Sequence, residues 1–243
     1  MGTKELLDQL DLPKTLHGIF NPVTLSTSLV LLLINITVQG LAFFLPTIVR
    51  AIYPHQTVVH QQLLTVPPYI FGSIVVLSIC GLSWRLDRRN IFMTIGSSIV
   101  IPGYIIFLAT NNSSARYAAT FIVAAGSFSF GALTQAQSSA NVVSDTARSA
   151  AIGTTVMFGN VGGLISTWSF LPFDGPNYPI GNGLNLAANS TIFIVTIALG
   201  FWMKANNKKR NLKSHSAQME LEQQSEKQIQ DLDWKHPHFR WRP

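Results

Sequence analysis

The sequence predicts an all-α membrane protein with six transmembrane helices, because the chain carries few charges and these are clustered. Only 12% of its 243 residues are charged, whereas 47% are hydrophobic. Soluble domains carry roughly 25% charged residues. A chain with half that share has too little polar surface to cover a globule, so a lipid bilayer is the solvent that the composition favours.

The charges divide the chain into long neutral runs. No Asp, Glu, Lys or Arg occurs between Lys14 and Arg50, or between Arg50 and Arg85. Further runs follow, and each can hold the ~20 apolar residues with which a helix crosses ~30 Å of hydrocarbon. The predicted helices cover residues 24–49, 67–84, 91–109, 118–140, 149–170 and 184–203.

Two polar regions flank this membrane region, which we assign to residues 21–203. Residues 1–20 mix charged and apolar side chains and lack the apolar core of a signal peptide, so they predict a cytosolic lead-in. Residues 204–243 are rich in charge and predict a cytosolic tail that is largely disordered, with one short helix near residues 218–229.

The basic residues predict the orientation. If the N-terminus is cytosolic, only Arg50 and Arg116 fall in outside loops. The positive-inside rule then places both termini in the cytosol. The basic residues predicted on that side are Lys4, Lys14, Arg85, Arg88, Arg89, Arg148, Lys204, Lys208, Lys209, Arg210 and Lys213.

Several function classes are disfavoured by the residues inside the predicted helices, which include no Asp, Glu, Lys, Arg or His. Intramembrane proteases and embedded proton relays need such groups at membrane depth. We therefore expect no enzyme, no metal site and no cofactor. The net charge of +6 does not predict nucleic-acid binding, because basic and aromatic residues do not interleave.

Uncharged polar residues and glycines remain as candidate functional residues. A solute in an aqueous cavity could bind the amides of Asn35, Gln39, Gln137, Asn141 and Asn160, although each could instead join two helices. Gly159 and Gly163 form a G-x-x-x-G step that lets helices approach closely, with Gly162 between them. This step fits either a moving helix beside a substrate path or tight static packing.

Ordered motifs resemble a known family. They are "FFLPTIV" (43–49), "TVPPYIFG" (65–72), "SWRLDRRN" (83–90), "PGY" (102–104), "ARSAAIGTTVMFGNVGG" (147–163) and "PNYPIGNGLNL" (176–186). Together they resemble the second half of major facilitator superfamily (MFS) transporters of the anion:cation symporter type, the allantoate permease-like family. The resemblance covers residues 16–210.

The resemblance implies transport of a small organic anion, such as a vitamin, another carboxylate or a ureido acid, by alternating access. It also implies proton symport, a plasma-membrane location and an N-terminal half that this chain lacks. The six helices would form two inverted three-helix repeats, 24–109 and 118–203, as half of an MFS fold. The alternative is a non-transporting truncated membrane protein that binds or regulates a full-length homologue.

A cytoplasmic gating role for Asp87, Arg88, Arg89 and Arg148 is also implied by the resemblance. The alternative for these residues is a static anchor of the topology. The sequence departs from the family pattern at three positions: Gln137 replaces a common Trp, Ala147 a common Lys, and Asn182 a His that is often present.

Overall fold

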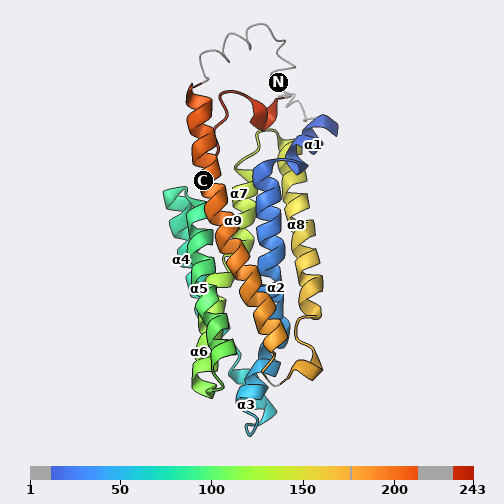
Figure 1. The fold of residues 1–243 in the computed structure, drawn as a ribbon, viewed down its shortest axis with the longest axis vertical. Coiled ribbons are helices and arrows are strands. Elements are labelled where there is room, and N and C mark those ends of the chain that lie inside the picture. Colours follow the sequence, from blue (N-terminus) through green and yellow to red (C-terminus); the bar gives the residue numbers. More distant parts are fainter. Residues whose placement is uncertain (1–11, 176, 213–231) are drawn as a thin grey trace, which may run out of the picture.

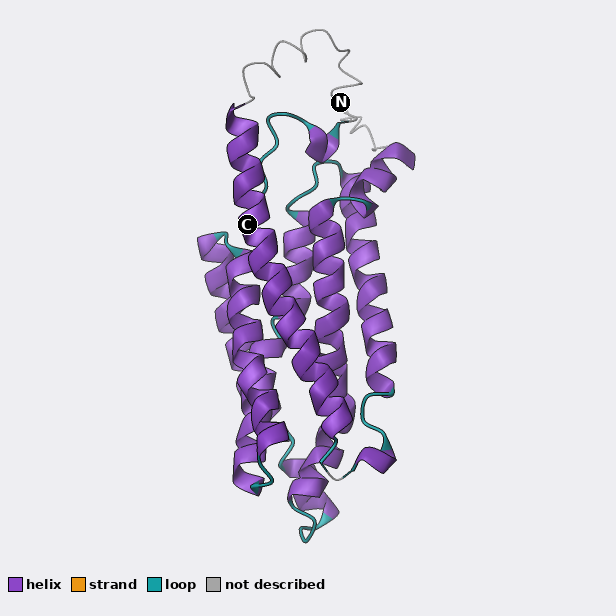
Figure 2. Ribbon diagram, viewed as in Figure 1, coloured by secondary structure: helices purple, strands orange, loops and turns teal. Residues whose placement is uncertain are grey.

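The computed structural model describes residues 12–175, 177–212 and 232–243, which form an elongated helical bundle (Figure 1). Within these residues every regular element is a helix and no strand is present, as the composition predicts (Figure 2). The elements are α1 (Leu12–Ile19), α2 (Pro22–Ile52), α3 (Val58–Leu63), α4 (Val66–Leu86), α5 (Arg89–Ala109), α6 (Ser113–Ser127), α7 (Phe130–Ser139), α8 (Asp145–Thr167), η1 (Pro172–Asp174), α9 (Pro179–Leu212) and η2 (Asp233–Lys235).

The predicted count of six apolar spans is not exact. In the described part of the chain, five segments are long and apolar enough to cross a membrane: Pro22–Ile52, Val58–Leu86, Arg89–Ala109, Ser113–Ser139 and Pro179–Leu212. The remaining predicted span corresponds to α8. Its 23 residues are long enough, but glycines and hydroxyl side chains lower its apolar content.

The predicted span 118–140 is interrupted. Helix α6 ends at Ser127 and α7 begins at Phe130. The hydroxyl of Ser127 donates to the carbonyl oxygen of Val123 at 2.7 Å. Such back-bonding can bend a helix, but Thr154 and Ser190 make the same kind of bond within the uninterrupted helices α8 and α9, so this bond alone does not explain the break.

Polar side chains at turns determine where helices begin. The Asn21 side chain accepts hydrogen bonds from the amides of Val23 and Thr24 at the start of α2. Ser144 accepts from Ala147 N at 3.2 Å in the same way, so α8 begins at Asp145 rather than at residue 149. Such caps satisfy amides that a helix start leaves without an intrahelical partner.

The most extensive helix contacts match the pattern expected of two inverted units, although the α7–α8 contact has no comparable counterpart between α2 and α4. Helix α2 packs mainly on α8, α4 on α6, and α5 on both α6 and α9. In two inverted units, α2 would correspond to α6–α7, α4 to α8 and α5 to α9. The α2–α8 contact then corresponds to the α4–α6 contact, and the α5–α6 contact corresponds to the α2–α9 contact. Helices α2 and α6–α7 also run in opposite directions (Figure 1). This pattern agrees with interleaved inverted repeats.

Glycines allow α2 and α8 to approach closely. A Cβ atom on Gly162 would overlap the carbonyl oxygen of Leu32, and one on Gly159 would lie 2.8 Å from Asn35 Nδ2. Gly163 is less tightly packed, since its Cβ would lie 3.4 Å from Gln39 Cγ. The close approach therefore uses the Gly159–Gly162 spacing, with Gly163 at its edge.

Helix α4 shows the lipid-facing character of the outer surface. It lies at the periphery, and large apolar side chains along it are exposed, among them Ile74 and Leu77 at 59% and 76%. Water would oppose such exposure, whereas hydrocarbon does not. Exposed Trp84 lies in the last turn of α4, and exposed Trp168 directly follows α8; aromatic belts of membrane proteins lie at such helix ends.

The bundle has two ends that differ in charge. We call the end with α1 and η2 the α1 end, and the end with α3 and η1 the α3 end (Figure 1). The turn from α4 to α5, the start of α8 and the end of α9 lie toward the α1 end, and most basic residues belong to these segments. Arg50 and Arg116 lie toward the α3 end.

The C-terminal residues 232–243 lie against the α1 end. Trp241 is only 2% exposed and packs with Val23, Leu199 and Met203. Helix α9 continues to Leu212, beyond residue 203, where the predicted span ends. The helix predicted near residues 218–229 lies outside the described residues.

The close approach of α2 and α8 predicts a difference between two glycines of α8. Gly162→Ala should lower the free energy of unfolding by about 1 to 3 kcal/mol, because the new methyl group overlaps the backbone of α2. Gly153→Ala meets open space and should leave stability unchanged or raise it by up to about 1 kcal/mol. Thermal unfolding in detergent measures both; equal effects would contradict the close approach.

Candidate functional site

Three of the predicted cavity residues lie along α2 and α8. Asn35 Nδ2 donates to the Gly159 carbonyl oxygen at 2.9 Å, so this amide joins the two helices. Gln39 lies beside Gly163 and remains partly exposed. Asn160 is exposed on α8, on the face adjoining Gly159 and Gly163. The structure thus places three amides near one contact between helices.

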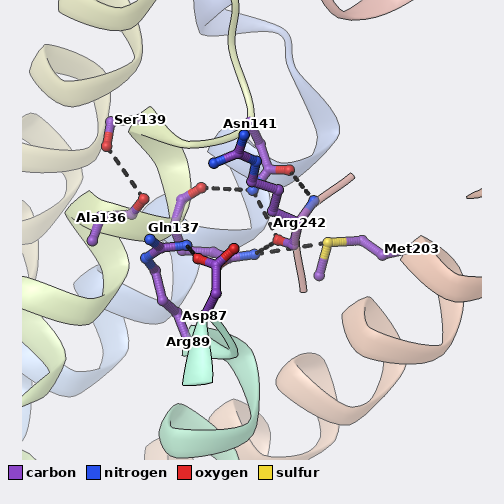
Figure 3. A network of polar contacts seen from close by, with 8 residues as sticks. All are labelled: Asp87, Arg89, Ala136, Gln137, Ser139, Asn141, Met203 and Arg242. Carbon is purple, nitrogen blue, oxygen red and sulfur yellow. Dashed lines mark hydrogen bonds and ion pairs between the residues drawn. The ribbon is translucent and has the colours of Figure 1, made fainter. Parts of the chain in front are cut away.

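The other two predicted cavity residues lie elsewhere, at the α1 end. Gln137 and Asn141 are fully buried where α7 ends. Gln137 Nε2 donates to the Arg242 carbonyl oxygen at 2.6 Å, and Asn141 Oδ1 accepts from Arg242 N at 2.8 Å (Figure 3). The five predicted residues therefore do not form one cluster, and residues 232–243 cover two of them.

A buried polar cluster between α2 and α9 was not predicted. Thr37 Oγ1 donates to Asn185 Oδ1 at 2.7 Å, and Asn189 Nδ2 donates to Thr37 Oγ1 at 2.8 Å. All three side chains are inaccessible to solvent. The sequence did contain a signal, because Asn182, Asn185 and Asn189 follow the spacing of one helix face.

A second buried group consists of hydroxyl side chains from three helices. Ser28 of α2 donates to Thr155 of α8 at 3.2 Å, Thr155 to Ser138 of α7 at 3.4 Å, and Ser138 to Thr24 of α2 at 3.3 Å. These bonds connect α2, α7 and α8 near the α1 end. Their residue types are common in membrane helices and gave no specific signal in the sequence.

The predicted gating residues form local ion pairs. Asp87 ends α4 with a positive φ of 49°, and its carboxylate lies 2.9 Å from Arg89 Nη1. Arg88 is exposed at the start of α5. Arg148 pairs with Asp145 at 2.8 Å within α8, so the structure does not bring it to Asp87.

A buried cation closes the α3 end. Arg116 of α6 is 5% exposed, and its Nη1 donates to Asn177 Oδ1 at 2.8 Å. Asn182 Nδ2 of α9 donates to the carbonyl oxygen of the same Asn177 at 2.9 Å. This end therefore joins α6 to the connection between α8 and α9.

Among the described residues, no group of three or more His, Cys, Asp or Glu side chains is placed so that it could hold a metal ion. Apart from the buried guanidinium of Arg116, the polar side chains that meet in the described residues are mainly amides, hydroxyls and a few surface ion pairs. Amides and hydroxyls can bind and release a polar solute.

Comparison with known proteins identifies similar sequences among fungal transporters. The chain is 28% identical over 177 residues to an uncharacterized transporter of Schizosaccharomyces pombe; the aligned region covers 73% of this chain and 35% of that protein. It is 28% identical over 182 residues to an MFS-type transporter of Penicillium expansum, with 72% and 35% covered. It is 29% identical over 188 residues to the high-affinity nicotinic acid transporter of Saccharomyces cerevisiae, with 77% and 35% covered.

These similarities support the predicted resemblance to MFS transporters and the prediction that the chain is not an enzyme. The chain spans about a third of the length of these relatives. No family model matches the chain, and no solved structure matches it.

The buried cluster between α2 and α9 predicts a specific loss of stability. Thr37→Val should lower the free energy of unfolding by about 1 kcal/mol, because two buried asparagines lose the hydroxyl that joins them. Thr191→Val on the exposed face of α9 should have little effect, since that hydroxyl bonds only its own helix. Thermal unfolding in detergent compares the two; an equal loss would contradict the joining role of Thr37.

Proposed function

We propose that this chain forms one half of an MFS-type transporter that carries a small organic anion across a membrane by alternating access. The observation that carries the proposal is the similarity to named transporters over most of the helical bundle. One of these relatives is named for nicotinic acid, a small carboxylate. We extend that substrate class, with other vitamins and ureido acids, to this chain.

The amides along α2 and α8 suit an anionic substrate. Asn160 is exposed, and Gln39 is partly exposed, so both can donate N–H groups without breaking the contact that Asn35 makes with Gly159. Uncharged donors bind a carboxylate without the cost of an embedded cation. In our proposal these side chains line one wall of the substrate path.

A second bundle completes the proposed transporter. In alternating access, the substrate lies near the midplane between two bundles, and one bundle rocks against the other. We assign the plasma membrane as the location and the cytosol as the compartment that the α1 end faces. The basic residues at that end support this orientation. For proton symport, the group that carries the proton would belong to the second bundle or would be the substrate's own carboxyl group.

Asp87 and Arg89 are the proposed control point at the cytosolic face. Their ion pair is held on a turn in which Asp87 has left-handed backbone geometry. Asp87 is over half exposed, with 55% of its side chain accessible, so its carboxylate can change partners when the bundle moves. Arg88 and Arg148 offer alternative cationic partners at the same face.

Uptake measurements test the transport proposal. Cells that express this chain alone should accumulate labelled nicotinate, pantothenate and allantoate only at background level, because one bundle has no partner to rock against. The chain joined to a six-helix first half from a related transporter should take up at least one of these anions. Robust uptake by the chain alone would contradict the need for a second half. Absence of uptake by the joined protein, at verified membrane levels, would contradict the substrate class.

The gating role of Asp87 can be separated from a topological role. In the joined protein, Asp87→Asn should reduce the initial rate of uptake several-fold while membrane insertion stays normal. Asn tolerates left-handed backbone geometry, so the change removes the charge and leaves the turn intact. The measurement compares uptake with the amount of protein at the cell surface; normal uptake would favour a static anchor.

A further inference from the structure

We infer that the α1 end contains a peptide-binding groove between the ends of α7 and α9, and that Trp241–Arg242 of this chain is its tethered ligand. This inference concerns binding of a peptide segment and does not depend on the transport proposal. It rests on main-chain hydrogen bonds, a buried aromatic anchor and a second point of attachment.

The main chain of the segment is bound by two asparagines in the same manner. Asn141 Oδ1 accepts from Arg242 N at 2.8 Å, and Asn141 Nδ2 donates to Arg242 O at 3.1 Å (Figure 3). Asn207 of α9 binds Trp241 likewise, with both distances 2.9 Å. An amide side chain that pairs with the N–H and C=O of one residue imitates a neighbouring strand. Two consecutive residues are thus recognised through their backbone.

The side chain of Trp241 supplies the apolar anchor. It is buried in the cluster with Val23, Leu199 and Met203. Its ring nitrogen Nε1 donates to Asn206 Oδ1 at 2.9 Å. The Arg210 guanidinium lies 5.4 Å from the ring centroid, within the range of cation–π contacts. The groove therefore selects a tryptophan at this position as well as an extended backbone.

A second attachment holds the beginning of the same segment. The Asp233 carboxylate accepts hydrogen bonds from Val143 N at 3.1 Å and from Ser144 N at 2.9 Å, just before α8. Trp234 Nε1 donates to the His17 carbonyl oxygen of α1 at 2.9 Å. The segment therefore connects α1, α7, α8 and α9 at one end of the bundle.

The groove contains polar groups that the segment satisfies. Gln137 and Asn141 are fully buried beneath the segment, and both amides donate to Arg242 O. If the segment left, Gln137 Nε2 would lose its carbonyl partner, whereas Asn141 Nδ2 would keep its 2.8 Å bond to the Gln137 carbonyl oxygen. An extended peptide segment with a tryptophan at the position of Trp241 is the class of ligand that would replace it.

Limited trypsin digestion of the full chain in detergent tests the attachment. The bond between Arg240 and Trp241 should be cut slowly, and Asn141→Ala with Asn207→Ala should accelerate cutting about tenfold or more, because each loses two main-chain hydrogen bonds. Asn160→Ala is the matched control and should not change the rate. Cutting after the buried Arg116 should stay equally slow in all variants, which verifies that the bundle remains folded. Equal rates at Arg240–Trp241 in wild type and double variant would overturn the inference.

A labelled peptide of residues 232–243 tests the groove itself. The full chain with Trp241→Ala has a weakened internal ligand and should bind this peptide, as measured by fluorescence polarisation, whereas wild type should bind it at least tenfold more weakly. A peptide with the same Trp241→Ala change should not bind. Equal binding to both proteins would overturn the inference. Neither experiment measures transport, so failure here leaves the proposed function standing, and the converse also holds.

Discussion

Lipid offers no hydrogen-bond partner, and this constraint accounts for most of the polar contacts inside the bundle. Thr37 pairs with Asn185 and Asn189, and the hydroxyls of α2, α7 and α8 pair with one another. The same constraint sorts the amides along α2 and α8. Asn35 is already engaged with a backbone carbonyl, whereas Gln39 and Asn160 keep exposed surface, so a solute could bind these two without breaking a helix contact.

The position of α8 depends on its small residues. Because the Gly159–Gly162 pair lets α8 lie directly against the backbone of α2, side chains as short as serine and threonine can bond across the contact. A helix with so much glycine is less apolar than its neighbours. The glycines that lower the apolar content of α8 are therefore the same residues that let it pack against the backbone of α2.

Much of the fold could be predicted from the sequence because charge is excluded from long runs. The rule works for α2, α4, α5 and α9, whose interiors are strongly apolar. It gives poor boundaries, since caps such as Ser144 start helices earlier than the apolar pattern does. It also does not predict the interruption between Ser127 and Phe130, because the apolar run continues across it.

The candidate site was less predictable, because its contacts join distant parts of the chain. Gln137 and Asn141 read as cavity residues, yet their partner Arg242 lies more than 100 positions away in a segment whose composition resembles that of disordered tails. The asparagines of α9 followed a helical spacing that pointed to one shared face. What spacing could not supply was Thr37, their partner on another helix.

The distance in sequence between these partners has a consequence for biosynthesis. Thr37 and Asn185 are separated by 148 positions, and a ribosome adds about 5 to 20 residues per second, so α2 exists for on the order of ten seconds before α9 emerges. During that interval its hydroxyl groups must be shielded by their own helix or by the insertion machinery. Thr27, which bonds the carbonyl oxygens of Val23 and Thr24, already has that self-contained arrangement. Thr37 is thus a residue of α2 that gains its partners on α9 only after most of the chain has been made.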